Sequence, residues 1–211
     1  MRFASVVLAV DSTLCGVEGI DWLAQRRGGD VARRVRELTD RAMNGEIPLD
    51  SVYGERLAII RPTQGDVDAL AQVYRRTVAD GAADAIRSWK RAGVRVVLVS
   101  GGIRQAIAPL ARELGVPLHA VELRFDDAGN YLDYDHASPL TTQDGKLRVV
   151  SALALPRPIL AVGDGSTDVS MKEAVDRFVA YTGFVRRESV VSAADAVASS
   201  YAELVTIVNG R

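Results

Sequence analysis

Four short runs of β-branched and other apolar residues, each of strand length, recur along this 211-residue chain. The runs span residues 5–10, 94–99, 158–162 and 178–181. Between them, residues 82–92, 104–114 and 146–155 repeat apolar side chains at the spacing of an amphipathic helix. Strands that alternate with helices predict an α/β fold in which one parallel sheet carries helices on both faces.

The segment between the first two predicted strands breaks this alternation. Four consecutive amphipathic helices are predicted there, over residues 18–27, 30–43, 49–60 and 64–77. Asp30 is the expected N-cap of the second helix. A helical block inserted directly after the first strand would lie over the carboxyl edge of the sheet. The sequence therefore predicts a core of residues 1–14 and 79–211 and a helical cap of residues 15–78.

A second irregularity follows the third predicted strand–helix unit. Residues 118–134 are expected to form a hairpin, with a tight turn at residues 126–130.

Length and charge limit the function classes. A chain of 211 residues can build one sizeable core with a small inserted module. The formal net charge is −1, so no overall positive field would attract nucleic acid or an anionic membrane surface. The arginine-rich stretches at residues 33–36 and 186–187 are expected to be solvated faces of helices or loops.

Cysteine and hydropathy exclude further classes. The single cysteine, Cys15, cannot form an intrachain disulfide, and two histidines are too few for typical zinc-site spacing. No apolar run reaches the roughly 18 residues that a membrane span needs. The apolar start of the chain lacks the cleavage pattern of a signal peptide, so we expect a cytoplasmic protein. The sequence does not indicate an oligomeric state.

Polar turns follow three of the predicted strands, at residues 11–13, 100–102 and 163–165. In a parallel sheet these turns meet at the carboxyl edge, where α/β proteins bind ligands. In the third turn, Asp164 and Asp168 place two carboxylates four residues apart, which suits Mg²⁺. Alone, this pattern is also typical of a loop with acidic N-caps.

Two further features are suited to phosphate. Ser100, Gly101 and Gly102 follow a buried strand and precede a helix, so their amides and hydroxyl could hold phosphate oxygens. Lys146 opens a predicted helix, and a lysine at the sheet edge could neutralise a phosphoryl group. Each signal is weak alone, since glycine turns are common and most lysines are solvated. Their order along the chain favours phosphoryl transfer.

The series of turns resembles the four motifs of the haloacid dehalogenase superfamily, and the resemblance to its phosphoserine phosphatase family extends over nearly the whole chain. The stretches that carry it are residues 11–14, 18–21, 41–43, 55–58, 99–102, 145–146 and 163–165. Residues 18–21, 41–43 and the region of Arg56 are specific to the phosphoserine branch. The resemblance implies a Rossmann-like core with a small helical cap that selects the substrate.

The resemblance also implies roles for core residues. Asp11 would be the general acid and base, and its backbone carbonyl would bind Mg²⁺. Asp164 would bind the same metal, with Asp168 in support. The groups that would hold the phosphoryl group are Ser100, Gly101, Gly102, Lys146 and Thr167.

In the cap, the resemblance implies that Glu18 pairs with an ammonium group of the substrate and Arg56 with its carboxylate. Met43 would pack over the bound molecule. A cation-binding and an anion-binding side chain that face one cavity suit a zwitterionic amino-acid phosphate. O-phosphoserine is therefore the expected partner, and another small phosphorylated metabolite is the alternative.

Ala9 stands where the family has its nucleophile. If Asp11 were the first aspartate of the family's Asp-x-Asp-Ser-Thr motif, the threonine would fall on Cys15. With Asp11 as the second aspartate, Ser12 and Thr13 fit, and the first position is Ala9. A methyl group cannot attack phosphorus or ligate a metal. A hydrolase by family, the chain is therefore expected to be inactive or nearly so.

Three explanations of this alanine remain. It could be an engineered trap that retains substrate, or a natural pseudoenzyme that binds a phosphorylated metabolite. In the third, water or Asp11 supports a residual hydrolysis.

Overall fold

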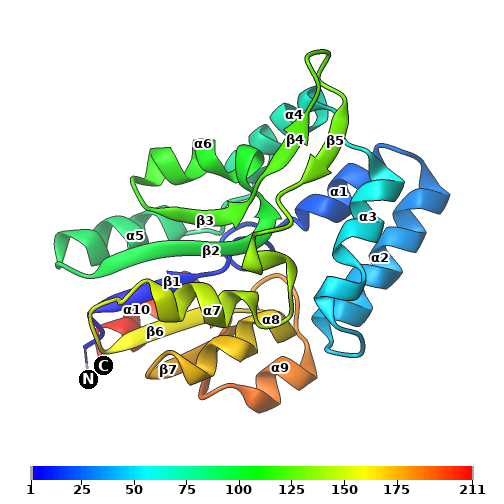
Figure 1. Cartoon of the computed structure of the whole chain (residues 1–211). Helices are drawn as coiled ribbons and strands as arrows, with labels where there is room; N and C mark the ends of the chain where they lie inside the picture. The colour runs from blue at the N-terminus through cyan, green and yellow to red at the C-terminus, as the bar shows by residue number, and fades with distance from the viewer. Residues whose placement is uncertain (1, 211) are drawn as a thin grey trace.

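The computed structural model describes residues 2–210 and confirms the predicted α/β fold (Figure 1). Six parallel strands form one sheet in the order β3-β2-β1-β6-β7-β8. They are β1 (Ser5–Leu8), β2 (Arg95–Ile103), β3 (Leu118–Val121), β6 (Ile159–Gly163), β7 (Arg177–Tyr181) and β8 (Ala196–Ala198). The order runs outward in both directions from the β1–β6 pair, which makes the crevice between them the expected ligand site.

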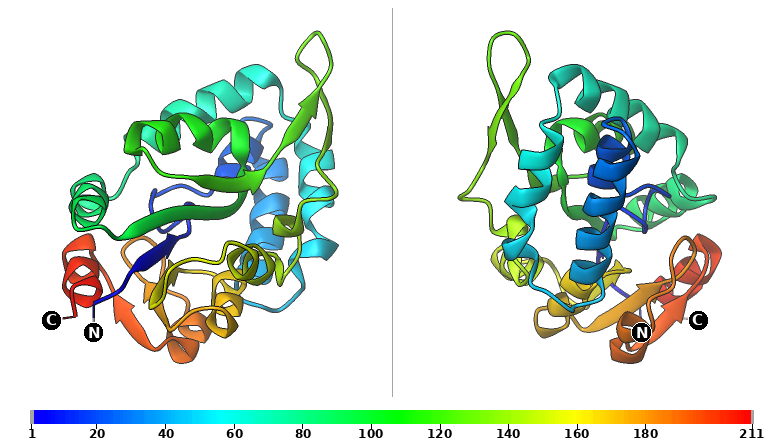
Figure 2. Two further views of the ribbon diagram at one scale, coloured as in Figure 1. Left: turned by 60° about the vertical axis from the view of Figure 1, so that its left-hand side comes forward. Right: turned by 90° about the vertical axis from the view of Figure 1, so that its right-hand side faces the viewer.

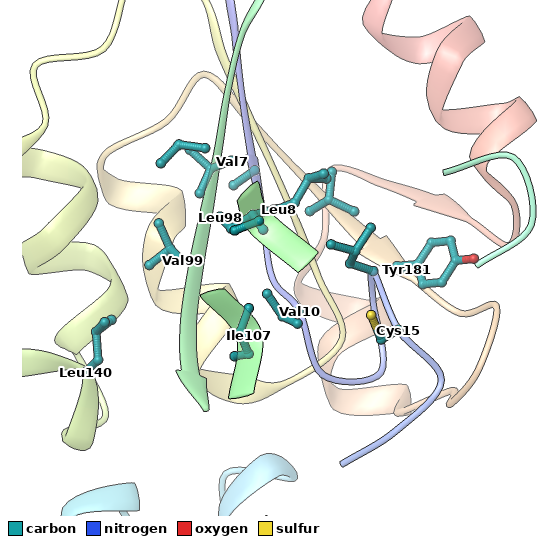
Figure 3. Packing of buried hydrophobic residues seen from close by; sticks show 14 of the residues in the cluster. Val7, Leu8, Val10, Cys15, Leu98, Val99, Ile107, Leu140 and Tyr181 are labelled. Carbon is teal, nitrogen blue, oxygen red and sulfur yellow. The ribbon is translucent and has the colours of Figure 1, made fainter. Parts of the chain in front are cut away.

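The central strand is buried on both faces. Val6 pairs in register with Val96 of β2 and with Leu160 of β6, and all four residues of β1 are buried. Figure 3 shows Val7 and Leu8 near Leu98 in the apolar cluster that surrounds this strand. A continuous apolar run is therefore stable here, because helices cover both sides of the sheet.

The helices divide between these two faces. One face carries α5 (Ala82–Arg91), α6 (Arg104–Leu114) and α10 (Tyr201–Val208). The other carries α7 (Gly145–Ala152), α8 (Ser166–Val169) and α9 (Glu188–Ala193) (Figure 1). Short 3₁₀ segments lie at η1 (Leu49–Ser51), η2 (Pro139–Thr141) and η3 (Ser170–Glu173).

Four helices are inserted between β1 and α5, the helix that precedes β2, as the sequence predicts. They are α1 (Gly19–Gln25), α2 (Gly29–Met43), α3 (Tyr53–Ile60) and α4 (Gln64–Arg76). Figures 1 and 2 show α1, α2 and α3 together at one end of the sheet, whereas α4 packs against α6. Thr63 and Asp66 form a capping box that fixes the start of α4.

Several local predictions are wrong. Asp30 is not an N-cap, because α2 already begins at Gly29, after Gly28 in the left-handed region at φ 108°. The single helix expected over residues 49–60 is divided, because Val52 leaves helical geometry at φ −124° between η1 and α3. The four strands predicted for the parallel sheet correspond to β1, β2, β6 and β7, so β3 and β8 were not predicted as members of this sheet.

The predicted hairpin is only partly confirmed. β4 (Leu123–Phe125) and β5 (Tyr131–Tyr134) pair antiparallel around the expected turn, where Gly129 has a φ of 80°. Leu118–Val121 instead joins the main sheet beside β2. The hairpin also reaches the inserted helices, since the Gln64 amide donates to the Gly129 carbonyl over 2.9 Å.

Within residues 2–210, none of the helices combines the length and the apolar character that crossing a membrane requires.

Candidate active site

A cavity of about 540 Å³, including its mouth, lies between the carboxyl ends of β1, β2 and β6 and the helices α1–α3. Every residue that the sequence analysis assigned to the site lines this cavity, with the exception of Ala9. These residues are Asp11, Glu18, Met43, Arg56, Ser100, Gly101, Gly102, Lys146, Asp164, Thr167 and Asp168. Strand-end turns and cap helices that are far apart in the sequence therefore meet at one place.

The Asp11 carboxylate is held by three donors. Its Oδ1 accepts hydrogen bonds from the Tyr74 hydroxyl and the Gly19 amide, both at 2.7 Å. Its Oδ2 accepts from the Ser100 hydroxyl at 3.1 Å. Ser12, which follows, has a φ of 50°, a left-handed conformation that is costly outside glycine and is often retained at functional sites. This network fixes Asp11 with its side chain at the cavity wall.

The turn expected at Ser100–Gly102 is instead the end of a strand. β2 continues to Ile103 with a register irregularity after Val99, and α6 begins only at Arg104. The Gly102 amide donates to the Ser100 hydroxyl over 2.9 Å. A side chain at Gly102 would place its Cβ 2.8 Å from Asp11 Oδ2, so only glycine leaves this close approach intact.

Lys146 forms a buried ion pair at the same edge. It lies in the first turn of α7, and its Nζ donates to Asp168 Oδ1 over 2.6 Å. Burial alone would lower the pKa of this ammonium, but the adjacent Asp168 carboxylate raises it above its ordinary value. Asp168 Oδ2 accepts from the Asp164 and Gly165 amides, so the carboxylate closes the turn after β6. Lys146 thus remains charged beside the cavity.

Asp164 is paired with an arginine. Its Oδ1 accepts from the Thr13 hydroxyl at 2.9 Å, and its Oδ2 accepts from Arg187 Nη1. The prediction that residues 186–187 are solvated is wrong for Arg187, whose side chain is only 7% exposed. Burial and the charge of Asp168 raise the pKa of Asp164 to about 6, although Arg187 opposes the shift.

Glu18 faces the core from the start of α1. Its Oε1 accepts from the Ser12 hydroxyl at 2.7 Å and lies 3.7 Å from Arg187 Nη2. Burial, together with the charges of Asp11 and Asp164, raises its pKa to about 8. A positively charged ligand group would favour the ionised form.

Arg56 is buried on α3, with 3% of its surface exposed. Its Nη1 donates to the Thr39 hydroxyl over 2.9 Å, and that hydroxyl lies 2.6 Å from Asp21 Oδ1. The Tyr53 ring lies 5.7 Å from the guanidinium carbon. Burial lowers the pKa of Arg56 below its ordinary value. Its Nε has no hydrogen-bond partner among the described residues, so a donor remains available at the cavity.

Contacts between α2 and the turn after β6 complete the cavity. The Ser166 hydroxyl donates to the Ala42 carbonyl over 2.7 Å and accepts from the Gln143 amide at 3.0 Å. Met43 approaches Gly165, where an added Cβ would lie 2.9 Å from its sulfur. Thr167 follows on α8 and is buried in the wall.

Ala9 lies directly after β1, two residues before Asp11. It is buried, and its amide donates to the Val162 carbonyl over 3.0 Å. That bond anchors position 9 between β1 and β6, at the crevice of the sheet.

Known proteins share this chain's sequence and its fold. The haloacid dehalogenase-like hydrolase family matches residues 6–173. Human phosphoserine phosphatase is 32% identical over 207 residues, which cover 95% of this chain and 91% of the human protein. The chloroplastic phosphoserine phosphatase of Arabidopsis thaliana is also 32% identical, over 95% of this chain and 70% of its own length. This chain belongs to the phosphoserine phosphatase family of the haloacid dehalogenase-like hydrolases.

Solved structures of this family have the same fold. A phosphoserine phosphohydrolase-like protein from Francisella tularensis superposes with a TM-score of 0.89 at 25% identity, covering 99% of this chain and all of that protein. A substrate-bound phosphoserine phosphatase complex superposes with a TM-score of 0.85 at 23% identity, over 99% of both chains.

Phosphatases of the haloacid dehalogenase type generally use Mg²⁺, and the side chains of this family member do not fit that metal as they stand. Position 9 offers a methyl group instead of a carboxylate. Both oxygens of Asp164 already accept donors, from Thr13 and Arg187. Across residues 2–210, no three carboxylate, thiol or imidazole side chains are arranged around a common metal position.

Several residues in or beside the cavity could not be predicted from the sequence. Tyr53 lines it and donates to the Gly101 carbonyl over 2.8 Å, and Tyr74 holds Asp11. Both lie at apolar positions of amphipathic helices, where an aromatic residue indicates core packing. Arg187 was missed because its charged neighbour Arg186 suggested a solvated stretch. The only available signal for the tyrosines was their hydroxyl, which needs a partner when buried.

Proposed function

We propose that the cavity is the active site of a phosphoserine phosphatase that lacks its nucleophile. The main support for the proposal is that phosphate-binding groups line one side of the cavity and groups suited to an amino acid line the other. Ser100 and Lys146 lie on the core side, and Glu18 and Arg56 lie on the cap side. The core groups suit a phosphoryl group, and the cap groups suit the ammonium and carboxylate of a phosphorylated amino acid.

The chemistry proposed for the core side follows from its hydrogen bonds. Lys146 supplies a positive charge, and the Ser100 hydroxyl supplies a donor, at the phosphoryl oxygens. Asp11 accepts hydrogen bonds from Ser100 and Tyr74 at the cavity wall, which supports its proposed role as the group that moves a proton to the leaving alcohol. The methyl group of Ala9 cannot form the phosphoenzyme, so turnover stops before hydrolysis.

The cap side selects the substrate in this proposal. Residues 15–78 act as the specificity lid, and residues 1–14 and 79–211 act as the catalytic core. Arg56 binds the carboxylate with the guanidinium edge that Thr39 leaves free, and Met43 covers the bound molecule. With Ala9→Asp, we propose that Mg²⁺ is the cofactor. It would be held by the restored carboxylate, the Asp11 carbonyl and Asp164, and Asp164 would exchange its contact with Arg187 for the metal.

The test is restoration of the nucleophile. Ala9→Asp should release phosphate from O-phosphoserine in the presence of Mg²⁺, faster than the parent chain by about four or more orders of magnitude. Ala9→Asn is the matched control, since it has nearly the same shape without a nucleophilic carboxylate. Equal rates for the two variants would contradict the proposal.

The alternative substrates are tested with the same restored protein. Phosphohomoserine, phosphoethanolamine and a sugar phosphate differ from phosphoserine in the groups that Glu18 and Arg56 would bind. A preference for any of them over phosphoserine would identify a different substrate but would still support a phosphatase reaction. The residue that the natural gene encodes at codon 9 separates an engineered trap from a natural binding protein.

A further inference from the structure

Arg187 places a fixed positive charge against Asp164, the residue proposed above as a metal ligand. It is the residue before α9 (Glu188–Ala193), and its side chain is 7% exposed. Its Nη1 contacts Asp164 Oδ2 and lies 3.4 Å from the Asp164 carbonyl oxygen. Its Nη2 lies 3.7 Å from Glu18 Oε1. The guanidinium therefore bridges a carboxylate of the core and a carboxylate of the cap.

A divalent cation at Asp164 would have to displace this arginine. The Asp164 side chain is 6% exposed, so the pair is buried on both sides. Removing one partner from a buried ion pair leaves an uncompensated charge, which is strongly unfavourable. After displacement, Arg187 would keep the two longer contacts, with the Asp164 carbonyl oxygen and with Glu18. The arrangement therefore favours the arginine over a metal at Asp164.

The charges around the cavity nearly balance when Arg187 is counted. Four carboxylates lie in or against it, and three cationic side chains oppose them. The carboxylates are Asp11, Glu18, Asp164 and Asp168, and the cations are Arg56, Lys146 and Arg187. A fifth carboxylate at position 9 would repel a phosphate dianion unless a divalent metal were present. Alanine at this position removes that repulsion.

We propose that this chain binds a phosphate monoester without a divalent metal, with Arg187 supplying beside Asp164 the positive charge that Mg²⁺ supplies in the catalytic members of the family. This inference rests on the proposed function, because it assigns the same cavity to the same class of ligand. It adds that Ala9 and Arg187 together define a metal-independent binding site.

The first experiment is calorimetric titration of the parent chain with O-phosphoserine, in one buffer with EDTA and in another with excess MgCl₂. We expect dissociation constants that agree within about threefold, which corresponds to less than 1 kcal/mol. Loss of affinity by about tenfold or more in EDTA would overturn the inference. MgCl₂ titrated alone should give no binding heat with the parent chain, and specific binding would count against the inference.

The second experiment removes the arginine. Arg187→Met should weaken phosphoserine binding in EDTA by about tenfold or more, and MgCl₂ should restore part of the affinity because Asp164 is freed. Arg186→Met is the matched control, since Arg186 is 53% exposed and pairs with the exposed Glu188. It should bind as the parent does. Unchanged binding of Arg187→Met in EDTA would overturn the inference.

Arg187→Lys covers the case in which Arg187→Met does not fold, as judged by circular dichroism. It keeps the charge, so metal-independent binding should persist with a loss of less than about tenfold. Mg²⁺-dependent binding by a folded Arg187→Lys variant would overturn the inference.

The outcomes also distinguish this inference from the proposed function. Binding of phosphoserine only with Mg²⁺ would remove the inference and leave the function standing. Absence of binding in both buffers would remove both. Metal-independent binding by the parent, together with no hydrolysis by Ala9→Asp, would keep the inference and remove the phosphatase assignment.

Discussion

The two walls of the cavity are built by different means. On the core side, Asp11 and Asp168 follow buried strands and are held in part by backbone amides, Asp11 by the Gly19 amide and Asp168 by the Asp164 and Gly165 amides. Asp168 in turn holds Lys146. On the cap side, the groups come from separate helices and are held by other side chains, as Thr39 holds Arg56. The positions at the strand ends are therefore fixed by the backbone of the sheet, whereas those on the helices depend on neighbouring side chains.

This difference predicts that phosphate binding and substrate selection can be altered separately. The core wall carries the groups proposed to grip phosphate, and the cap wall carries those proposed to recognise the remainder of the ligand. Substitutions on the core wall should therefore affect all phosphate ligands, and substitutions on the cap wall should discriminate among them.

The largest effect is expected at Asp11. In the Ala9→Asp background, Asp11→Asn should lower kcat by about 10²–10⁴-fold, because general acid–base catalysis contributes that much. The measurement is steady-state phosphate release. The exposed Asp127 provides a control, since Asp127→Asn should leave kcat unchanged. Retention of kcat within tenfold by Asp11→Asn would separate Asp11 from the chemistry.

Lys146 tests the core wall through stability. Lys146→Met leaves Asp168, which is 2% exposed, without its cation, and should lower the free energy of unfolding by about 3–5 kcal/mol. Lys172→Met removes a partly exposed pair with Asp195 and should cost about 1 kcal/mol or less. Urea unfolding measures both. Equal losses would show that burial of the Lys146 pair is not what stabilises this edge.

Arg56 tests whether the cap wall discriminates. Arg56→Gln should weaken O-phosphoserine binding by about 10–100-fold, because it removes the partner of the carboxylate. Phosphoethanolamine lacks that carboxylate and should bind as it does to the parent. Arg34→Gln is the control, since Arg34 makes an exposed ion pair with Glu55. An equal loss of affinity for both ligands would contradict the separate roles of the two walls.

Glu18 gives the smallest effect and a dependence on pH. A carboxyl group whose pKa is raised in the folded state stabilises the fold at low pH, and this contribution is lost as pH rises. For Glu18 the loss should occur between the ordinary value of 4.5 and about 8. Glu18→Gln stays neutral, so at pH 8.5 it should exceed the parent in stability by about 1 kcal/mol, or about 2–4 °C in Tm.

Thermal unfolding at pH 5 and pH 8.5 measures this difference. The gain of Glu18→Gln over the parent should be smaller at pH 5, where the parent carboxyl is largely protonated. A gain that is equal at both pH values would show that Glu18 does not titrate in this range.

The sequence alone determined the architecture and most of the cavity. Buried parallel strands are apolar throughout, so β1, β2, β6 and β7 can be recognised from the local sequence as short apolar runs. Because the carboxyl ends of parallel strands meet at one edge, Asp11, Ser100 and Asp164 could be placed together before the fold was known. The order of the turns then indicated the family resemblance, and this resemblance showed that alanine stands at position 9, where a nucleophilic aspartate is expected.

The short edge elements and the partners of the buried charges depend on long-range contacts that the sequence does not reveal. β8 spans three residues and is stable as a strand because β7 pairs with it, so no local pattern marks it. The contact of Arg187 with Asp164 joins residues 23 positions apart, and a charged side chain carries no periodic signal of burial. Long-range contacts of this kind arise only when the sheet has brought the loops together, which is why the sequence predicted a solvated arginine there.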